Sequence, residues 1–170
     1  MKTEKTNGKA TDKDEFFMRR ALAEARRAEA DGEVPVGAVV VRNGLIIGRG
    51  RNSSIRLNDP TGHAEIRALR QACRKARNYR LESCDLFVTL EPCAMCVGAA
   101  VQARIRRIVF GATDPKAGAI GSILRFPFEK TNHRLEVREG VLARECGRIL
   151  KDFFRKKRGR RTLVFKTRSG

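Results

Sequence analysis

Residues 86–102 read LFVTLEPCAMCVGAAVQ, and this stretch decides the fold class. Leu86 to Leu90 is a short apolar run typical of a buried strand, and Pro92 suits the first position of a helix. Apolar residues continue that helix to Gln102, and Ile108 to Phe110 then has the pattern of another strand. A strand, helix and strand with such short connections predict two parallel strands with a helix packed across them.

The residues before this stretch predict further layers. Apolar residues at helical spacing indicate a helix over residues 14–30. Two apolar runs, 36–41 and 45–49, flank Asn43-Gly44, a pair that tolerates the positive φ of a tight hairpin. A second amphipathic helix begins near His63, which we expect in its first turn.

The residues after the opening stretch complete the predicted fold. Residues 134–138 indicate a fifth strand, and apolar spacing places a last helix at about 141–157. The order of elements predicts the α/β class, as a three-layer α/β/α sandwich around a mixed, roughly five-stranded sheet.

The length of the chain, 170 residues, suits one domain. We expect it over residues 14–157, between a flexible N-terminal segment, 1–13, and a basic tail, 158–170. Thr162 to Lys166 is either an extended strand or an unstructured end. No apolar run approaches the roughly 20 residues of a membrane span, and the N-terminus lacks a signal segment. A cytoplasmic protein without a membrane partner is expected.

The charge of the chain favours a polyanionic partner. There are 37 Lys and Arg residues against 19 Asp and Glu, a formal net charge of +18. Much of the excess lies between Arg155 and Arg168, where acids are almost absent. Such a charge attracts nucleic acid over long distances, although a solvated basic tail without a specific partner is the alternative.

Three potential metal ligands lie at the starts of two predicted helices. His63 opens one helix, and Cys93 and Cys96 open another. Cysteines three apart on a helix share a face, and a helix N-terminus favours their thiolate forms. Three protein ligands leave the fourth tetrahedral position of a zinc ion for water, as in catalytic sites. The spacing suits metal binding in a reducing cytoplasm better than a disulfide framework.

Glu65, two residues beyond the histidine, is the candidate catalytic residue. Bound zinc can lower the pKa of water from about 15.7 to roughly 7. A carboxylate in this position points away from the metal ligand but stays nearby. It can therefore take a proton from water and deliver it to a ring nitrogen and a departing amine. One zinc ion per subunit is expected.

A structural zinc site is the alternative, and it would need a fourth protein ligand. His133, Cys73, Cys84 and Cys146 are the candidates. The three cysteines lie in apolar or helical contexts that are typical of buried core thiols. Glu65 would have no task in such a site.

These motifs resemble the zinc-dependent cytidine and tRNA adenosine deaminases, and a longer pattern is similar to the bacterial tRNA adenosine deaminase branch. The resemblance covers roughly residues 14–157. It departs at Gly62, where alanine is expected, and in 122–131, which does not align. The matching residues, apart from the zinc motif, are Glu33-Val34-Pro35-Val36-Gly37-Ala38-Val39, Asn52, Asp59-Pro60-Thr61-Gly62, Ile66, Val88-Thr89-Leu90-Glu91, Phe110-Gly111-Ala112, Asp114, Asn132-His133-Arg134 and Asp152-Phe153-Phe154-Arg155.

The resemblance implies a cytidine deaminase-like fold and hydrolysis of adenosine to inosine at the first (wobble) anticodon position of a tRNA. In that family the histidine and cysteines hold zinc and the glutamate moves protons, which implies His63, Cys93, Cys96 and Glu65 here. It also implies a homodimer and an arginine tRNA as substrate. The implied substrate-binding residues are Asn52, Val36, Ala64, Leu90, Asp114, Asn132, His133, Arg134, Phe154 and Arg155.

Several of these residues have a purely structural alternative. Asn52 can end a strand or shape a turn, and His133 can fill a gap near the last strand as well as contact RNA. Adjacent helical residues face about 100° apart, so of Phe153 and Phe154 we expect Phe154 to stack on a base.

Two other functions use the same residues. A deaminase of a free base or nucleoside would need the same zinc and glutamate, but it would gain little from the basic charge, whereas RNA gains phosphate contacts. A non-enzymatic module, in which zinc staples the fold and the surface binds RNA, would not need Glu65.

Overall fold

The structure, a computed structural model, describes the backbone of residues 11–166 and the side chains of residues 11–159. Within that part, no helix has the length and apolar character needed to cross a membrane. The elements in chain order are α1 (Asp12–Ala30), β1 (Gly37–Arg42), β2 (Leu45–Arg51), α2 (Ser54–Leu57), α3 (Ala64–Ala76), β3 (Cys84–Leu90), α4 (Ala94–Gln102), β4 (Arg107–Ala112), the 3-10 helix η1 (Phe128–Lys130), β5 (Glu136–Arg138) and α5 (Ala143–Lys166).

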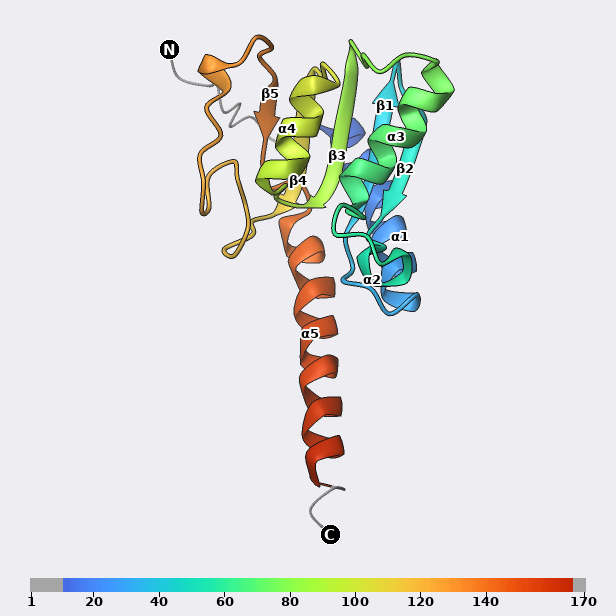
Figure 1. Ribbon diagram of the computed structural model, residues 1–170, viewed down its shortest axis with the longest axis vertical. Coiled ribbons are helices and arrows are strands. Elements are labelled where there is room, and N and C mark those ends of the chain that lie inside the picture. The colour runs from blue at the N-terminus through green and yellow to red at the C-terminus, as the bar shows by residue number, and fades with distance from the viewer. Residues whose placement is uncertain (1–10, 167–170) are drawn as a thin grey trace.

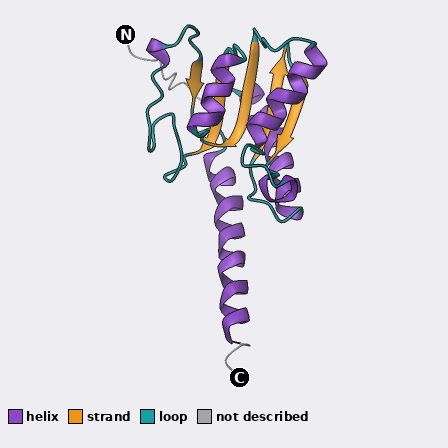
Figure 2. Cartoon of the chain, in the orientation of Figure 1, coloured by secondary structure: helices purple, strands orange, loops and turns teal. Residues whose placement is uncertain are grey.

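The strands form one mixed sheet in the order β2-β1-β3-β4-β5, with helices on both faces (Figures 1 and 2). β1 is antiparallel to both of its neighbours, whereas β3, β4 and β5 are parallel to one another. One apolar core lies between the sheet and α3 with α4, and a second lies between the sheet and α1 with α5. The predicted three-layer α/β/α class is confirmed.

The predicted hairpin is present between β1 and β2. Asn43 and Gly44 have φ angles of 50° and 75°, so this pair makes the tight reversal that its sequence favours. α1 begins at Asp12, two residues earlier than predicted, because the Thr11 hydroxyl accepts a hydrogen bond from the backbone N–H of Asp14 at 3.2 Å. The fifth strand is shorter than predicted, at 136–138.

Two predicted helix starts are shifted, and the shift matters for the site. Pro92 is not the first residue of α4, because Cys93 is its N-cap with an extended backbone, at ψ 170°. His63 likewise is the N-cap of α3, at ψ 151°, and does not lie in its first turn. Both residues therefore stand at helix ends, where several backbone N–H groups have no partner within the helix.

The last helix extends beyond its predicted end. Residues 158–166 have a helical backbone, so Thr162 to Lys166 is neither an extended strand nor an unstructured end. Apolar periodicity could not indicate this, because the extension leaves the body of the protein (Figure 1) and has no neighbouring layer to face. Lysine and arginine are good helix formers, and a helix closes its hydrogen bonds locally. Residues 1–10 and 167–170, at the ends of the two predicted terminal segments, lie outside the described residues.

The two single-turn helices, α2 and η1, are not predicted from sequence because one turn carries no periodicity. α2 follows β2 directly and ends at Asn58, whose φ is 50°. Its first residues and the segment after it are held together, since the backbone N–H of Ser53 donates to the carbonyl of Gly62 at 2.9 Å. This link connects the end of β2 to the start of α3.

α3 lies directly on β2 because β2 has glycines where the helix crosses. A Cβ atom on Gly50 would overlap the carbonyl oxygen of Ala64, and one on Gly48 would overlap that of Ala68. Only glycine permits so close an approach of backbone to backbone. The first turn of α3, with His63 and Glu65, is thereby held in place relative to the sheet.

A buried ion-pair network joins α1 to the opposite end of the sheet. Asp14 is only 1% exposed, and its carboxylate accepts from Arg107 Nη2 at 2.9 Å. Arg107 also pairs with Asp85 at 2.9 Å, and Arg138 Nε lies 3.4 Å from Asp14. Charged groups this buried are tolerated only when they are paired, so the network specifies how α1 sits against β3, β4 and β5.

Candidate active site

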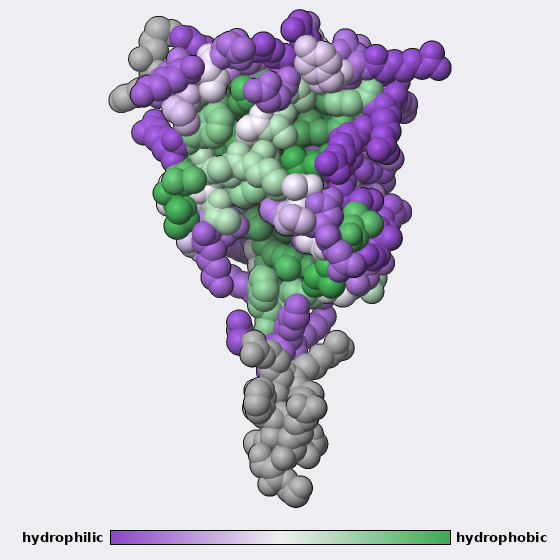
Figure 3. Space-filling view, in the orientation of Figure 1, coloured by the Kyte–Doolittle hydropathy of each residue, from purple (hydrophilic) through white to green (hydrophobic). Residues whose placement is uncertain are grey.

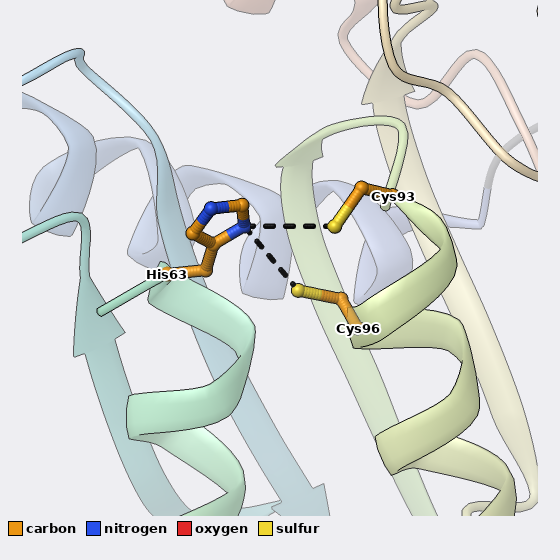
Figure 4. Close-up of side chains that lie close together, drawn as sticks. All are labelled: His63, Cys93 and Cys96. Atoms are coloured by element: carbon orange, nitrogen blue, oxygen red, sulfur yellow. Dashed lines mark hydrogen bonds between the residues drawn. The ribbon is translucent and has the colours of Figure 1, made fainter. Parts of the chain in front are cut away.

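Three side chains that could hold a metal ion, His63, Cys93 and Cys96, meet where α3 and α4 begin (Figure 4), and we refer to them as the metal-binding group. His63 Nδ1 lies 3.7 Å from Cys93 Sγ and 3.5 Å from Cys96 Sγ. All three donor atoms lie within 4.8 Å of one another, and no other such group of three occurs in the described part of the chain. Cys93 is the N-cap of α4, Cys96 lies in the first turn of that helix, and His63 is the N-cap of α3 on the same face of the sheet.

The spacing of these donors fits a zinc ion. Zn–N bonds of about 2.1 Å and Zn–S bonds of about 2.3 Å in a tetrahedron require an N···S separation of about 3.6 Å. The observed separations, 3.5 and 3.7 Å, bracket that value. The imidazole atom that faces the thiols is Nδ1.

No fourth protein ligand joins this group within the described residues. Cys84 lies at the other end of β3, Cys146 lies on α5 and faces the core on the opposite side of the sheet, and Cys73 is half-buried on α3. His133 Nε2 lies 2.7 Å from the carbonyl oxygen of Ile105. The arrangement therefore favours a site that keeps a position for water over a structural zinc site.

The two thiols differ in their affinity for a proton. A hydrogen bond from the Cys96 thiol, aided by His63 and opposed by burial, lowers the pKa of Cys93 to about 4. The same hydrogen bond and burial raise the pKa of Cys96. The hydrogen bond to Cys93 raises the pKa of His63, and nearby Glu65 adds to this effect. Without metal, one thiolate therefore sits between two proton donors.

Glu65 is buried beside this group, with 4% of its surface exposed. Burial raises the pKa of its carboxyl, and the positive charge of His63 opposes the rise. A hydrogen bond between Glu65 and Cys96 contributes to the raised pKa of that thiol, so the carboxyl reaches the metal-binding group without belonging to it. A carboxyl whose pKa is raised holds a proton more readily than an exposed glutamate, which suits acid–base catalysis.

Four of the predicted substrate-binding residues lie around this group. The backbone N–H of Asn52 donates to the carbonyl of Val36 at 3.0 Å, and the side-chain amide of Asn52 makes no hydrogen bond among the described residues. Ala38 pairs with Val88, which brings Val36 level with Leu90. Ala64, the first residue of α3, is fully buried. The structure thus gathers Asn52, Val36, Ala64 and Leu90 at one end of the sheet.

Glu91 holds the adjoining loop, a role that sequence reasoning did not assign. Its carboxylate accepts hydrogen bonds from the backbone N–H groups of Ile120, Gly121 and Ser122 at 3.0, 2.9 and 3.1 Å, and from that of Asp114 at 3.1 Å. The Ser122 hydroxyl donates to it as well. Burial would raise the pKa of Glu91, but these hydrogen bonds outweigh it and lower the pKa. Its place directly before Pro92 and Cys93 is the only signal in the sequence.

Asp114 lies in the loop that Glu91 holds. Its Oδ1 atom accepts from the backbone N–H groups of Lys116 and Ala117 at 2.9 and 3.2 Å. The side chain therefore shapes its own turn, while its second oxygen has no hydrogen bond among the described residues. A role in substrate binding stays a prediction.

Asn132, His133 and Arg134 are not brought to the metal-binding group. Asn132 accepts from Arg104 at 3.0 Å and His133 contacts Ile105, and both contacts lie beyond the C-terminal end of α4. Cys93 precedes the other end of that helix, whose nine residues span about 13 Å. His133 has the structural role that its sequence left open, and contact of these residues with RNA stays a prediction.

The two adjacent phenylalanines of α5 face different ways, as expected. Phe153 is buried at 8% exposure, and Phe154 is 41% exposed. Arg155 pairs with Asp152 at 2.9 Å and keeps most of its side chain in solvent. Stacking of Phe154 on a base is sterically open and stays a prediction.

The chain is similar to known deaminases in sequence. Residues 11–158 match the family model described as MafB19-like deaminase. The chain is 56% identical over 147 residues to a tRNA-specific adenosine deaminase of Haemophilus influenzae, an alignment that covers 85% of each protein.

Two solved structures share the fold. One belongs to a study of A-to-I editing by tRNA:A34 deaminases at the wobble position of transfer RNA. It is 47% identical, with a TM-score of 0.76 over 79% of this chain and 99% of that chain. The other is a guanine deaminase from Nitrosomonas europaea, 27% identical, with a TM-score of 0.70 over 82% and 83% of the two chains.

Zinc binding is expected to release protons. Cys93 is already a thiolate at neutral pH, so zinc displaces chiefly the proton of Cys96, and at lower pH it must also displace a proton from His63. As the pH is lowered, the apparent zinc affinity should fall about tenfold per pH unit for each proton that zinc displaces. Calorimetric titration of metal-free protein, in buffers of different ionisation enthalpy, counts the protons. Cys73→Ser should leave the count unchanged, and Cys96→Ser should lower it. Zinc uptake without proton release would contradict this description.

Glu91→Gln is expected to loosen residues 114–122 while leaving the metal-binding group intact. The substituted amide turns one acceptor into a donor that faces backbone N–H groups, at a cost of about 3 kcal/mol in the free energy of unfolding. Urea unfolding measures the loss, and hydrogen exchange should quicken at the amides of residues 120–122 but not in β1. Unchanged exchange at those amides would show that other contacts hold the loop.

Proposed function

We propose that this chain, which belongs to the tRNA-specific adenosine deaminases within the MafB19-like deaminase family, converts adenosine to inosine at the first anticodon position of a transfer RNA. The observation that carries the proposal is the buried carboxyl of Glu65 beside three donors spaced for zinc. The reaction consumes one water, breaks the bond between carbon 6 and the exocyclic nitrogen, and releases ammonia.

We propose zinc as the cofactor, one ion per subunit, held by His63 Nδ1 and by the thiolates of Cys93 and Cys96. When bound there, zinc would act as a Lewis acid that makes water acidic enough to supply hydroxide near neutral pH. The N···S separations of 3.5 and 3.7 Å support this metal. The absence of a fourth protein ligand among the described residues supports a catalytic role over a structural one.

Glu65 is proposed to move the protons. Its carboxylate accepts a proton from the attacking water and passes it to nitrogen 1 of the adenine ring as carbon 6 becomes tetrahedral. It then takes the second proton of that water from the new hydroxyl on carbon 6 and gives it to the departing amine, so that ammonia leaves and the ring keeps the oxygen. Burial, which raises the pKa of Glu65, supports this exchange because it makes the carboxylate a stronger base toward the water proton.

The groups around the site are proposed to bind the extruded nucleoside. Asn52 has an uncommitted side-chain amide, and its backbone is fastened to Val36. Val36, Ala64 and Leu90 supply apolar walls beside it. A nucleotide in an anticodon loop is outside a regular duplex, so its extrusion costs less free energy than flipping a base from a helix.

RNA, and not a free base, is proposed as the substrate. The likeness to a guanine deaminase favours a free base as the second candidate, because the same donors and glutamate serve any ring with an exocyclic amine. The net charge of +18 and the basic α5 support RNA as the substrate, because positive charge strengthens binding to RNA phosphates. Asp114, Asn132, His133, Arg134, Phe154 and Arg155 are the proposed outer contacts.

We further propose a cytoplasmic homodimer that acts on an arginine tRNA. The partly exposed face of α4 carries small apolar residues, and pale green surface gathers over this helix in Figure 3. Ile123 and Leu124 add exposed apolar area, at 56% and 54%. Exposed apolar surface of this kind supports a protein–protein contact.

The proposed reaction is tested by incubating zinc-loaded protein with an anticodon stem-loop that has adenosine at the first anticodon position, beside free adenosine, cytidine and guanine. Inosine confined to the RNA is the expected result. Turnover of guanine alone would favour the second candidate, and zinc binding with no turnover at all would favour the RNA-binding module. Full-length arginine tRNA, compared with other tRNAs, tests the acceptor.

Glu65→Gln is expected to lower the single-turnover rate at least about 100-fold, because the amide cannot accept and return a proton. Zinc content and RNA affinity should change little, since Glu65 is not among the metal-binding donors. Glu82→Gln, an exposed substitution that removes the same charge, is the matched control. Retained activity in Glu65→Gln would remove Glu65 from the reaction.

A further inference from the structure

Four arginines from three chain segments gather around the first turns of α3. Arg51 ends β2, Arg56 lies in α2, and Arg67 and Arg70 lie on α3. The contact of Gly50 with Ala64 and Ala68 brings the end of β2 against this part of the helix. The hydrogen bond from Ser53 to Gly62 folds α2 back beside it. We refer to these four residues as the arginine cluster.

Three carboxylates lie near the arginine cluster, and none of them forms an ion pair with Arg67. Asp31 pairs with Arg51 at 2.8 Å, and Asp59 lies 4.0 Å from Arg70. Glu33, 1% exposed, accepts from the backbone N–H of Arg56 at 2.7 Å and so caps α2. The guanidinium groups of Arg56 and Arg67 form no ion pair among the described residues, and Asp59 attracts Arg67 only from a longer distance.

Arg67 is the unusual member of the cluster. Its Nε atom is buried and has no hydrogen-bond partner in the described part of the chain. Burial lowers the pKa of Arg67, and repulsion from Arg56, Arg51 and Arg70 lowers it further. A buried donor without an acceptor is unfavourable, and so is repulsion between neighbouring positive charges. An external acceptor with negative charge would remove both costs.

The cluster adjoins the candidate active site. Asn52 directly follows Arg51, and the backbone N–H of Arg67 donates to the carbonyl of His63 at 3.1 Å. Arg67 is therefore one helical turn, about 6 Å along the axis, from the metal-binding residue that begins α3. When an RNA strand places one nucleoside against Asn52, the neighbouring phosphate of that RNA is within reach of this turn of α3.

We propose that the arginine cluster, with Arg67 at its centre, binds one backbone phosphodiester of the RNA next to the nucleoside held in the active site. The planar guanidinium presents paired N–H donors that match phosphate oxygens. This inference rests on the proposed function, because it assumes that RNA enters at Asn52. The same chemistry would also hold a free phosphate, and the experiment separates the two sources.

The test is a double-mutant cycle that combines a substitution of Arg67 with neutralisation of single phosphates in the anticodon stem-loop. RNAs with one neutral methylphosphonate linkage at a time, around the target adenosine, are titrated against the wild-type and Arg67→Met proteins. Methionine keeps the apolar volume of the arginine stem and removes the charge. Arg19→Met, on α1 across the sheet, removes an equal charge from a residue 59% exposed and serves as the control.

A methylphosphonate at one particular linkage should lower the RNA affinity of the wild-type protein about tenfold. Arg67→Met should lower the affinity for unmodified RNA by the same factor. The methylphosphonate at that linkage should then cause no further loss in Arg67→Met. The slope of log affinity against log salt should become less negative by about 0.7 in Arg67→Met. The rate at saturating RNA should be unchanged, because the cluster holds no reacting atom. If Arg67→Met does not fold, Arg56→Gln, a substitution of an exposed residue, replaces it in the test and should show the same coupling more weakly.

Equal losses at every linkage in both proteins, or the same loss in Arg19→Met, would overturn the proposal. A second result would also overturn it: inorganic phosphate binds the wild-type but not the Arg67→Met protein, while Arg67→Met binds RNA as well as Arg19→Met does. The cluster would then bind a free phosphate and not the RNA. The two proposals fail separately. Absence of inosine from wild-type protein refutes the reaction, whereas inosine without coupling at any linkage refutes only the phosphate contact.

Discussion

Three donor atoms from two separate helices have to meet within a few ångströms, and much of the fold follows from that requirement. His63 and Cys93 are both N-caps, so each projects from a helix end toward the other. α3 lies against β2 and β1, and Cys93 follows β3, the other neighbour of β1 in the sheet. The glycines of β2 let α3 approach closely enough for His63 to face the thiols. A wider layer spacing would move the imidazole out of range of both sulfurs, since the donor separations match a tetrahedral edge to about 0.1 Å.

Burial alone does not decide the protonation of the two glutamates at this end of the sheet. Glu65 and Glu91 are equally buried, at 4% and 3% exposure. For Glu65, burial outweighs the hydrogen bonds from its own backbone N–H and from Cys96, so its pKa is raised, which suits it to proton transfer. Glu91 accepts from four backbone N–H groups and one hydroxyl, which lowers its pKa and makes it a permanent anion that orders the loop. Hydrogen-bond donors thus separate a chemical role from a structural one.

The positive charge of the chain is arranged at two length scales. α5 leaves the body as a long basic helix, suited to attracting RNA over distances comparable to the Debye length. The arginine cluster is compact and partly desolvated, and it lies beside Asn52. Charge of the first kind sets the rate and salt dependence of encounter, whereas charge of the second kind can specify the register of a strand.

Much of this protein can be predicted from its sequence, because the relevant signals are local. Asn43-Gly44 specifies a hairpin, apolar spacing identifies the main helices, and the motif residues His63, Glu65, Cys93 and Cys96 indicate a zinc-dependent site through their types and spacing. Only the tertiary structure decided the role of Glu91, whose partners are 23 to 31 residues away, and the isolation of Arg67, which depends on β2, α2 and α3 together. It also separated Asn132 and His133 from the metal-binding group and extended α5 as a helix. The reason is physical: periodicity reports the face that a residue presents within its own element, whereas burial and hydrogen-bond partners depend on how distant elements pack.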